Sequence, residues 1–307
     1  MTSTPVGHLR VIVLGSAAGG GSPQWNCRCP VCSLAWAGDP RVPRRTQSSL
    51  AVSVDGRTWA ILNCSPDIRE QIGATQALWP TGEARHTPIG SVVLTNADVD
   101  HVAGLLSLRE RSGLTLWATA TTARYLRQNP IFSVLADDVV EWRTIEPEAA
   151  FAPLEALSVV PFLAPGKVPL YAEAGEVETD RRTEATVGLE VRAGDKRLVY
   201  LPGCALVDED VLERAEGADA LLFDGTVFTD DEMMSAGVGR KTGRRMGHVP
   251  ISGDGGSLEA FAGSGIGRRI YIHINNTNPI LIEGSPERLT VEAAGWVVAE
   301  DGMEIVP

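Results

Sequence analysis

A group of polar residues directly after an apolar segment constrains this chain more than any other feature. Residues 91–95 form a candidate strand, and Asn96, Asp98, Asp100 and His101 follow it at once. Three of these side chains stand at alternating positions and the fourth is next to the third, so they converge at one strand end. Carboxylates and imidazoles are common metal ligands in proteins. The segment therefore predicts a loop that can hold a metal ion.

Composition narrows the class of protein and its partners. The chain has 307 residues, of which 44% are hydrophobic and 21% charged, as in globular proteins. No apolar run approaches the ~18 residues of a membrane span, and no signal-peptide pattern is visible at the N-terminus. We therefore expect a cytoplasmic protein that does not associate with membranes. The chain has a net charge of -12 and no basic stripe, so we do not expect nucleic acid as a partner. A homo-oligomer is possible from the sequence.

Strand-like and helix-like segments alternate along the chain, with no evident linker. The strand-like runs are rich in Val, Ile and Leu and bounded by Gly, Pro and Asp; they cover 9–14, 51–54, 58–62, 91–95, 114–118, 157–162, 187–191, 198–201, 220–223 and 269–274. The helix-like runs cover 66–76, 102–111, 121–128, 209–215 and 257–261. Asp67 is a candidate cap of the first of these helices. The acidic stretch 172–186 is expected to be a surface loop. The pattern predicts one α/β domain over residues 1–307, with two packed mixed β-sheets and helices outside.

Three of the five cysteines are crowded into six positions. Cys27, Cys29 and Cys32 follow a glycine-rich turn, and Pro30 lies between them. Three unrelated buried thiols are the alternative, but the proline and glycines favour a loop over a core strand. Thiolates at this spacing can bind one zinc, and a structural zinc requires a fourth ligand from elsewhere. The sequence predicts a zinc knuckle at residues 27–32.

The glycine-rich turn itself, residues 15–21, has two interpretations. A nucleotide-binding loop would end in Lys-Ser/Thr or continue as a full G-x-G-x-x-G motif with a later acidic residue. Neither feature is present in this sequence. A backbone turn that leads into the knuckle is the better prediction.

The histidines give a second set of candidate metal ligands. His8 and His86 lie in polar surroundings and are expected to be solvated, whereas His101, His248 and His273 lie at the ends of predicted segments. Asp224 ends a further strand, and Asp100, His101, His273 and Asp224 together suit a single divalent metal with open positions. Two imidazoles and a carboxylate favour non-haem Fe(II), but zinc also fits these ligand types.

The loop after residue 95 resembles the His-x-His-x-Asp-His motif of the metallo-β-lactamase superfamily. Asn96 and Asp98 stand where that motif has its first two histidines, and only Asp100 and His101 match. The resemblance implies the αβ/βα sandwich of that superfamily, but the losses oppose a two-zinc hydrolase. The chain also lacks the histidine that hydrolytic relatives carry after the strand at 157–162, and the Gly-Asp that follows the strand at 198–201.

Within that superfamily, the chain is identified by resemblance as a member of the pyrroloquinoline quinone biosynthesis protein B (PqqB) family. The matching segments span nearly the whole chain: residues 15–21, 23–27, 47–49, 63–67, 96–101, 246–248 and 273–279. The resemblance implies synthesis of the redox cofactor PQQ from a Glu and a Tyr of a peptide precursor. The implied step is Fe(II)- and dioxygen-dependent hydroxylation of the tyrosine ring in a crosslinked Glu–Tyr intermediate.

The resemblance also implies roles for individual residues. Asp100, His101 and His273 fit the iron ligands, with Asp224 as a further candidate, while His248 and Asp98 are candidates for catalysis on the substrate. Phosphonate-pathway phosphodiesterases of the superfamily have a three-cysteine knuckle too, and the position of their fourth zinc ligand corresponds here to Asn276. A polyanionic substrate needs cationic contacts, and the candidates near His248 are Arg240, Lys241, Arg244 and Arg245, for which a solvated surface is the alternative.

Three other functions compete with the hydroxylase. The first is a zinc hydrolase of the same fold, which the missing histidine ligands oppose. The second is a non-catalytic carrier or release factor for PQQ with a vestigial site. The third is a structural zinc protein in which the knuckle holds the only metal. Metal identity and dioxygen consumption discriminate among them.

Overall fold

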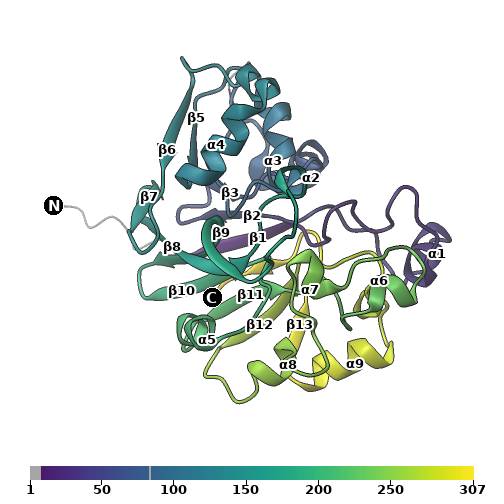
Figure 1. Ribbon diagram of the computed structural model, residues 1–307. Helices are drawn as coiled ribbons and strands as arrows, with labels where there is room; N and C mark the ends of the chain where they lie inside the picture. Colours follow the sequence, from purple (N-terminus) through teal and green to yellow (C-terminus); the bar gives the residue numbers. More distant parts are fainter. Residues whose placement is uncertain (1–7, 83) are drawn as a thin grey trace.

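Two seven-stranded β-sheets pack face to face in the computed structural model, which describes residues 8–82 and 84–307. Figure 1 shows the two sheets with helices on their outer sides. In the first sheet the strand order is β14-β1-β2-β3-β4-β5-β6, and in the second it is β13-β12-β11-β10-β9-β8-β7. Each sheet contains both parallel and antiparallel neighbours. The predicted metallo-β-lactamase-like sandwich of two mixed sheets is confirmed.

The strands and helices have the following bounds. The first sheet contains β1 (Arg10–Gly15), β2 (Ser49–Ser53), β3 (Trp59–Leu62), β4 (Ile89–Val93), β5 (Leu114–Ala118), β6 (Val140–Thr144) and β14 (Glu304–Ile305). The second contains β7 (Phe151–Leu154), β8 (Leu157–Gly166), β9 (Arg181–Ala193), β10 (Lys196–Leu201), β11 (Ala220–Asp224), β12 (Arg268–Ile272) and β13 (Trp296–Val298). The α-helices are α1 (Pro30–Trp36), α2 (Ile68–Ala74), α3 (Val99–Val102), α4 (Ala120–Gln128), α5 (Glu209–Ala215), α6 (Glu232–Ser235), α7 (Gly243–Met246), α8 (Ser257–Ala260) and α9 (Pro286–Ala293). Short 3-10 helices are η1 (Gln76–Leu78), η2 (Ala103–Leu108), η3 (Pro130–Val134), η4 (Leu170–Ala172) and η5 (Pro279–Leu281).

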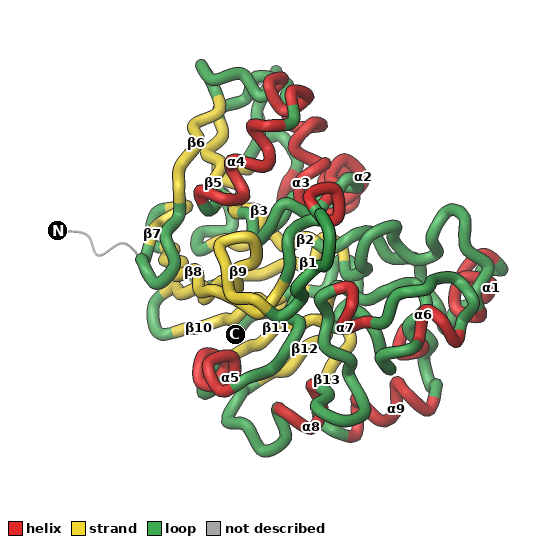
Figure 2. The backbone as a smooth tube through the Cα atoms, in the orientation of Figure 1, coloured by secondary structure: helices red, strands yellow, loops and turns green. Residues whose placement is uncertain are grey.

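The core has three apolar layers, because each sheet buries both of its faces. Between the sheets, side chains such as Leu62 of β3 and Leu189 of β9 are fully buried. The outer face of the first sheet packs against α2 and α4, and that of the second against α5, α8 and α9. Figure 2 shows these helices outside the strands. Strands buried on both faces read as continuous apolar runs, which is why the sequence revealed them.

The parallel strands bring distant loops to one edge. In the first sheet β3 to β6 run parallel, and in the second β10 to β13 do. In the register of β11 with β12, Asp224 pairs with Ile272, so Asp224 and His273 lie at neighbouring strand ends. An isolated bridge joins Asn96, after β4, to Thr186 of β9 in the other sheet. The carboxyl ends of parallel strands therefore meet where ligands bind in open α/β sheets.

Several predicted boundaries were wrong. The segment 172–186 is not all loop, because β9 begins at Arg181. The segment 102–111 is not one α-helix, because α3 ends at Val102 and η2 follows. Asp67 does stand at the N-cap position of α2, but its carboxylate accepts from the backbone and side-chain nitrogens of Gln47 and makes no capping bond.

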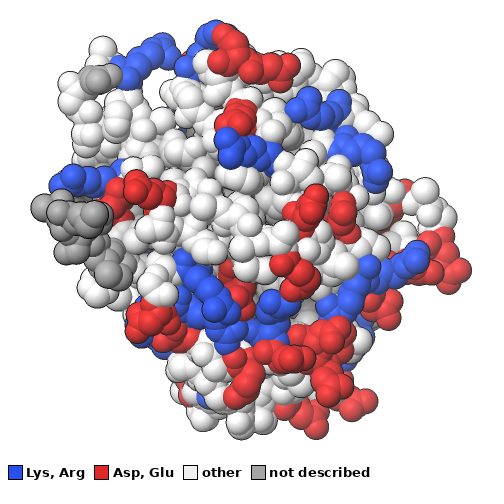
Figure 3. Space-filling model, turned by 90° about the vertical axis from the view of Figure 1, so that its left-hand side faces the viewer, with Lys and Arg blue, Asp and Glu red and all other residues white. Residues whose placement is uncertain are grey.

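Basic and acidic side chains are interleaved on the face drawn in Figure 3. Among the residues that the structure describes, none of the helices has both the length and the apolar character that a bilayer crossing requires. That nucleic acid is not a partner stays a prediction.

Candidate metal centre

Three side chains from the two sheets face one another at the meeting strand ends. Asp100 and His101 lie on α3 after β4, and His273 follows β12. One possible ligand atom of each lies within 4.8 Å of the others. His273 Nε2 is 3.0 Å from Asp100 Oδ2, and His101 Nε2 is 4.0 Å from the same oxygen. His273 has a φ of 58°, a left-handed conformation that is uncommon outside glycine and typical of functional positions.

Asn96 determines which nitrogen of His101 is free. Asn96 Oδ1 accepts a hydrogen bond from the backbone N–H of Asp98 at 3.1 Å, which identifies that atom as the amide oxygen. The same oxygen lies 2.7 Å from His101 Nδ1, so Nδ1 carries the proton and donates it. Nε2 of His101 therefore presents a lone pair to the cluster. Burial lowers the pKa of His101 to about 4, so the ring is neutral.

Thr226 has the same effect on His273. Its hydroxyl lies 2.6 Å from Asp224 Oδ1, its shortest contact, and 2.9 Å from His273 Nδ1. If the hydroxyl donates to the carboxylate, it accepts from Nδ1–H, and Nε2 of His273 faces Asp100 with its lone pair. Burial lowers the pKa of His273, but the hydrogen bond and charge of Asp100 outweigh it and raise the pKa. A cation between the two groups would take the place of that proton.

Asp224 is fully buried and has hydrogen bonds at both oxygens. Oδ1 accepts from the backbone N–H and the hydroxyl of Thr226, and Oδ2 from the backbone N–H of Cys204 and from His248 Nδ1. Asp224, His248 and His273 form a second triad within 4.8 Å. Because its lone pairs are already used, Asp224 is better suited to orienting His248 and Thr226 than to binding a metal directly.

His248 and Asp98 border the cluster. The His248 ring stacks on His273 with centroids 5.2 Å apart, and its Nδ1 lies 2.6 Å from Asp224, which leaves Nε2 free. Burial, and then the charge of Asp100, raises the pKa of Asp98 to about 6. A carboxyl of this kind can exchange a proton near neutral pH.

The donor set fits a single divalent cation. Two imidazoles and one carboxylate face a common point, and His101 Nε2 is buried without a hydrogen-bond partner among the described residues. Two ligand atoms about 2.1 Å from one cation, at right angles, are about 3 Å apart, which matches the separation of His273 Nε2 and Asp100 Oδ2. Asn96 is engaged in orienting His101, so it does not supply the ligand that a second cation would need.

The predicted knuckle forms a compact cluster of sulfurs. Cys27, Cys29 and Cys32 lie within 4.8 Å of one another. Each sulfur accepts a backbone N–H at 3.4 Å, which lowers the pKa of its thiol. Burial outweighs this effect for Cys29 and Cys32, whose pKa is raised, so a bound zinc ion would be needed to hold these two as thiolates. The side chain of Asn276 lies over the cluster, with Nδ2 3.2 Å from the sulfurs of Cys27 and Cys32. A half-turn of that amide would present its oxygen instead, so the fourth predicted ligand is in reach of a zinc ion.

Two features around the knuckle were not predicted. Pro30 begins α1, so the second half of the knuckle lies in the first turn of a helix and not in a loop. The glycine-rich turn is not just a connection either. Gly19 lies against Asp100, and a Cβ at this position would be 3.4 Å from Oδ2. The backbone N–H of Ala18 bonds to Ile274 O at 2.8 Å, so the turn forms one wall of the metal centre.

The four cations predicted to bind substrate separate into two pairs. Lys241 and Arg245 lie beside Glu173, at 3.7 and 3.3 Å. Arg244 donates to the backbone of Asp254, and Arg240 is exposed. Sequence reasoning missed Glu173, which it assigned to a surface loop, and the nearby Lys167, which has no motif of its own.

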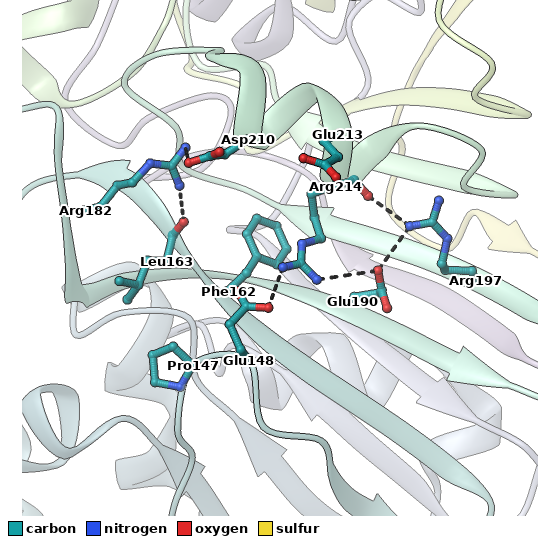
Figure 4. Close-up of a pocket in the computed structure, with 10 residues that line it drawn as sticks. All are labelled: Pro147, Glu148, Phe162, Leu163, Arg182, Glu190, Arg197, Asp210, Glu213 and Arg214. Carbon is teal, nitrogen blue, oxygen red and sulfur yellow. Dashed lines mark hydrogen bonds and ion pairs between the residues drawn. The ribbon is translucent and has the colours of Figure 1, made fainter.

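The structure also contains a groove of about 570 Å³ that shares no residue with these clusters. Phe162 forms part of its floor, and charged side chains of β9, β10 and α5 line it. Figure 4 shows that these charges are mutually paired: Glu190 bonds to Arg197 and Arg214, and Arg182 pairs with Asp210. Because its cations and anions neutralise one another, the groove offers no obvious charge for a ligand.

Comparison with known proteins identifies the family. The sequence matches the beta-lactamase superfamily domain over residues 58–274. It is 58% identical over 297 residues to coenzyme PQQ synthesis protein B of Methylorubrum populi, covering 97% of this chain and 99% of that one. The chain belongs to the coenzyme PQQ synthesis protein B family. Its counterpart from Rhizobium meliloti is 52% identical, covering 97% of each chain.

Solved structures agree with this membership. The crystal structure of Zn²⁺-bound PqqB from Methylobacterium extorquens superposes with a TM-score of 0.95 at 57% identity and covers 96% of this chain and 99% of that one. A diphosphatase of the PhnP family shares the fold, with a TM-score of 0.66 at 22% identity over 97% of each chain. The family and the donor clusters together support metal binding by this member of the PqqB family.

Proposed function

We propose that the protein acts in PQQ synthesis as an Fe(II)- and dioxygen-dependent hydroxylase of the tyrosine ring in a peptide-derived, crosslinked Glu–Tyr intermediate. The observation that carries the proposal is the donor set at the strand ends. Asp100, His101 and His273 supply two imidazoles and one carboxylate, and Asn96 serves one of them as an orienting partner. This is the ligand pattern of mononuclear non-haem iron oxygenases. Membership of the PqqB family supports the role in PQQ synthesis.

Iron supplies the dioxygen chemistry that protein side chains lack. In the overall reaction a ring C–H becomes C–OH with one oxygen atom of dioxygen. The other atom leaves as water, with two electrons and two protons from an external reductant. The protein must hold the ring in place and accept the proton that leaves its carbon.

We assign the acceptance of that proton to His248. Its Nδ1–H is held by Asp224, which leaves the lone pair of Nε2 to accept a proton. Asp98, with a pKa of about 6, is the second group that can carry a proton at neutral pH. We assign both residues to proton transfer and Asp224 to the orientation of His248.

We also propose a structural zinc ion at the knuckle, in addition to the iron at the strand ends. Cys27, Cys29 and Cys32 would bind it as thiolates, with Asn276 as the fourth ligand. Zinc in the related PqqB crystal structure supports zinc binding in the family. The knuckle is joined to the active-site loop by sequence, because Asn276 is three residues after His273.

The test is incorporation of oxygen from ¹⁸O₂. The protein is reconstituted with Fe(II) under anaerobic conditions, mixed with a crosslinked Glu–Tyr substrate and ascorbate, and exposed to ¹⁸O₂. We expect a product heavier by one ¹⁸O atom, and we expect this product to be absent with His101→Ala or His273→Ala. His86→Ala, which changes an exposed histidine, is the matched control.

The opposite result would move the protein to another class. Absence of labelled product, together with tight PQQ binding and zinc only at the knuckle, would identify a carrier. Hydrolysis of phosphodiester or peptide substrates by the zinc-loaded protein would identify a hydrolase.

A further inference from the structure

Glu173 lies among three cations next to the metal centre. Its Oε1 is 2.9 Å from Lys167 Nζ, and its Oε2 is 3.3 Å from Arg245 Nη2 and 3.7 Å from Lys241 Nζ. The Glu173 side chain is only 12% exposed. In a chain with a net charge of -12, three cations facing one carboxylate are a local excess of positive charge.

These cations are fixed beside His248. Arg245 belongs to α7, which ends at Met246 and is followed by its C-cap Gly247, the residue before His248. Gly247 packs on the stem of Lys167, since a Cβ at Gly247 would be 3.2 Å from Lys167 Cγ. The carbonyl of Lys167 accepts from the hydroxyl of Thr186, the residue that bridges to Asn96. Lys167 is therefore connected by hydrogen bonds to the segment that carries the candidate metal ligands Asp100 and His101.

Glu173 comes from a different kind of segment, which we call the strap (residues 168–180). The strap connects β8 to β9 and contains η4 as its only helix among the described residues. In Figure 1 it passes between α3 and α7. One contact on the α3 side is the hydroxyl of Tyr171, which donates to Ala97 O at 2.9 Å in the loop that carries Asp98 and Asp100.

The fit of Glu173 to the three cations is loose. A charge-assisted N–H···O⁻ bond is typically about 2.8 Å long, and only the Lys167 contact approaches that length. Arg245 Nη1 is buried and has no hydrogen-bond partner among the described residues. A buried guanidinium nitrogen without an acceptor is costly, so the cluster has unused capacity for an anion.

We propose that Lys167, Lys241 and Arg245 form a carboxylate-binding subsite, that Glu173 occupies it in the free protein, and that a carboxylate of the ligand displaces Glu173. The proposal rests on the proposed function only for the class of ligand, a polycarboxylate. It explains why a carboxylate on a surface segment is drawn inward toward cations near His248. It also assigns the strap a role, because ligand binding would release Glu173, and with it this part of the strap, from the three cations.

The experiment measures binding without turnover. PQQ, a tricarboxylate, is titrated into the zinc-loaded full-length protein by calorimetry, with the trimethyl ester of PQQ as the uncharged control ligand. If Glu173 competes with the ligand, its removal abolishes that competition. We expect the Kd of Glu173→Gln for PQQ to be about five- to tenfold lower than that of the wild type. Glu176→Gln removes the same charge from an exposed position of the strap and should leave the Kd unchanged.

The cations give the converse expectation. Lys241→Met and Arg245→Met should each raise the Kd for PQQ about fivefold or more, because each loses a charged contact. Lys196 lies on β10 and pairs with Asp219, so Lys196→Met is the matched control and should bind as the wild type does. The trimethyl ester should show the same Kd with all variants.

Three results would overturn the proposal. They are an unchanged Kd in Glu173→Gln, an equal shift in Glu176→Gln, and no PQQ binding by any variant. The outcome is independent of oxygen chemistry. Tighter PQQ binding by Glu173→Gln in a protein that forms no ¹⁸O product would support the subsite and reject the hydroxylase. An unchanged Kd in Glu173→Gln in a protein that does form the ¹⁸O product would reject the subsite and support the hydroxylase.

Discussion

Asn96 is the residue that most clearly distinguishes this centre from a two-metal site. It occupies the position of a histidine ligand in the superfamily motif, and here its amide oxygen holds Nδ1 of His101 at 2.7 Å. A residue that orients a ligand has an effect on metal affinity without touching the metal. Asn96 would therefore orient one metal ligand, His101, and would not bind a second cation itself.

Replacing Asn96 by Ala therefore tests an indirect effect. His101 would lose the partner that fixes its tautomer, and we expect the Fe(II) dissociation constant to rise about 10- to 100-fold. The measurement is a competition titration with a chelator under anaerobic conditions. Asn129→Ala, at the end of α4, is the control. Equal iron affinity in Asn96→Ala and wild type would show that Asn96 has no orienting role.

Thr226 offers a parallel test on the other histidine. Thr226→Val keeps the shape but removes the hydroxyl between Asp224 and His273, so metal affinity should fall about tenfold or more. The variant should also lose about 1–3 kcal/mol of unfolding free energy, because buried partners are left unpaired. Thr226→Ser keeps the hydroxyl and should restore metal affinity. If Ser and Val variants bind metal equally, the hydroxyl does not act on His273.

At the scale of elements, the knuckle and the His273 loop are one unit. Asn276 lies on the sulfurs of the knuckle, and His273 is three residues before it. Cys32→Ser should remove the structural zinc, lower the melting temperature and weaken iron binding as well. Cys64→Ala removes a buried cysteine outside the knuckle and should keep one zinc per chain by metal analysis. Full iron affinity in a zinc-free Cys32→Ser protein would contradict this coupling.

Helix α6 adds a pH-dependent contribution to stability. Burial raises the pKa of Glu232 to about 7, although Thr277 and the backbone N–H of Phe228 donate to it. The folded protein thus binds this proton more tightly than the unfolded chain. Its stabilising effect is complete below the unfolded pKa near 4.5 and is lost as the pH rises through 7. Between these limits the change is on the order of 3 kcal/mol.

Glu232→Gln should remove that dependence. The free energy of unfolding, measured with urea from pH 5 to pH 8, should decline less steeply in Glu232→Gln than in the wild type. Asp138→Asn is the control, because the hydrogen bond from Arg111 lowers the pKa of Asp138 below its usual range and out of this window. Parallel pH profiles for Glu232→Gln and wild type would contradict the assignment.

The elements that the sequence revealed are those with a strong local pattern. Strands β4, β5 and β11 are largely buried and mostly apolar, and helix α5 was predicted at its observed bounds. Strand β6 was missed because most of its residues are exposed at the sheet edge. The start of β9 was read as loop because charged residues and threonines dominate it.

The candidate site was only partly predictable for a related reason. Asp100, His101 and His273 could be named because motifs surround them. Thr226 and Glu173 could not, since their roles depend on contacts with residues about 50 or more positions away, such as His273 and Arg245. Family resemblance predicted the ligands, and the structure shows which residues contact them.

For the whole molecule, the two-sheet arrangement explains how one cation can join both halves. Asp100 follows a strand of the first sheet and His273 a strand of the second, and 173 positions separate them in sequence. Parallel strands whose ends meet at one edge bring them to 3.0 Å. A metal at this point would crosslink the sheets, while the zinc at the knuckle would fix the loop of one ligand.

The most direct test of this account is anomalous diffraction at the iron and zinc edges, from crystals of protein reconstituted with Fe(II) and zinc. The account predicts one iron peak between Asp100, His101 and His273, and one zinc peak among Cys27, Cys29 and Cys32. Two metal peaks at the strand ends, or an iron peak away from His101 and His273, would contradict a mononuclear centre built by these residues.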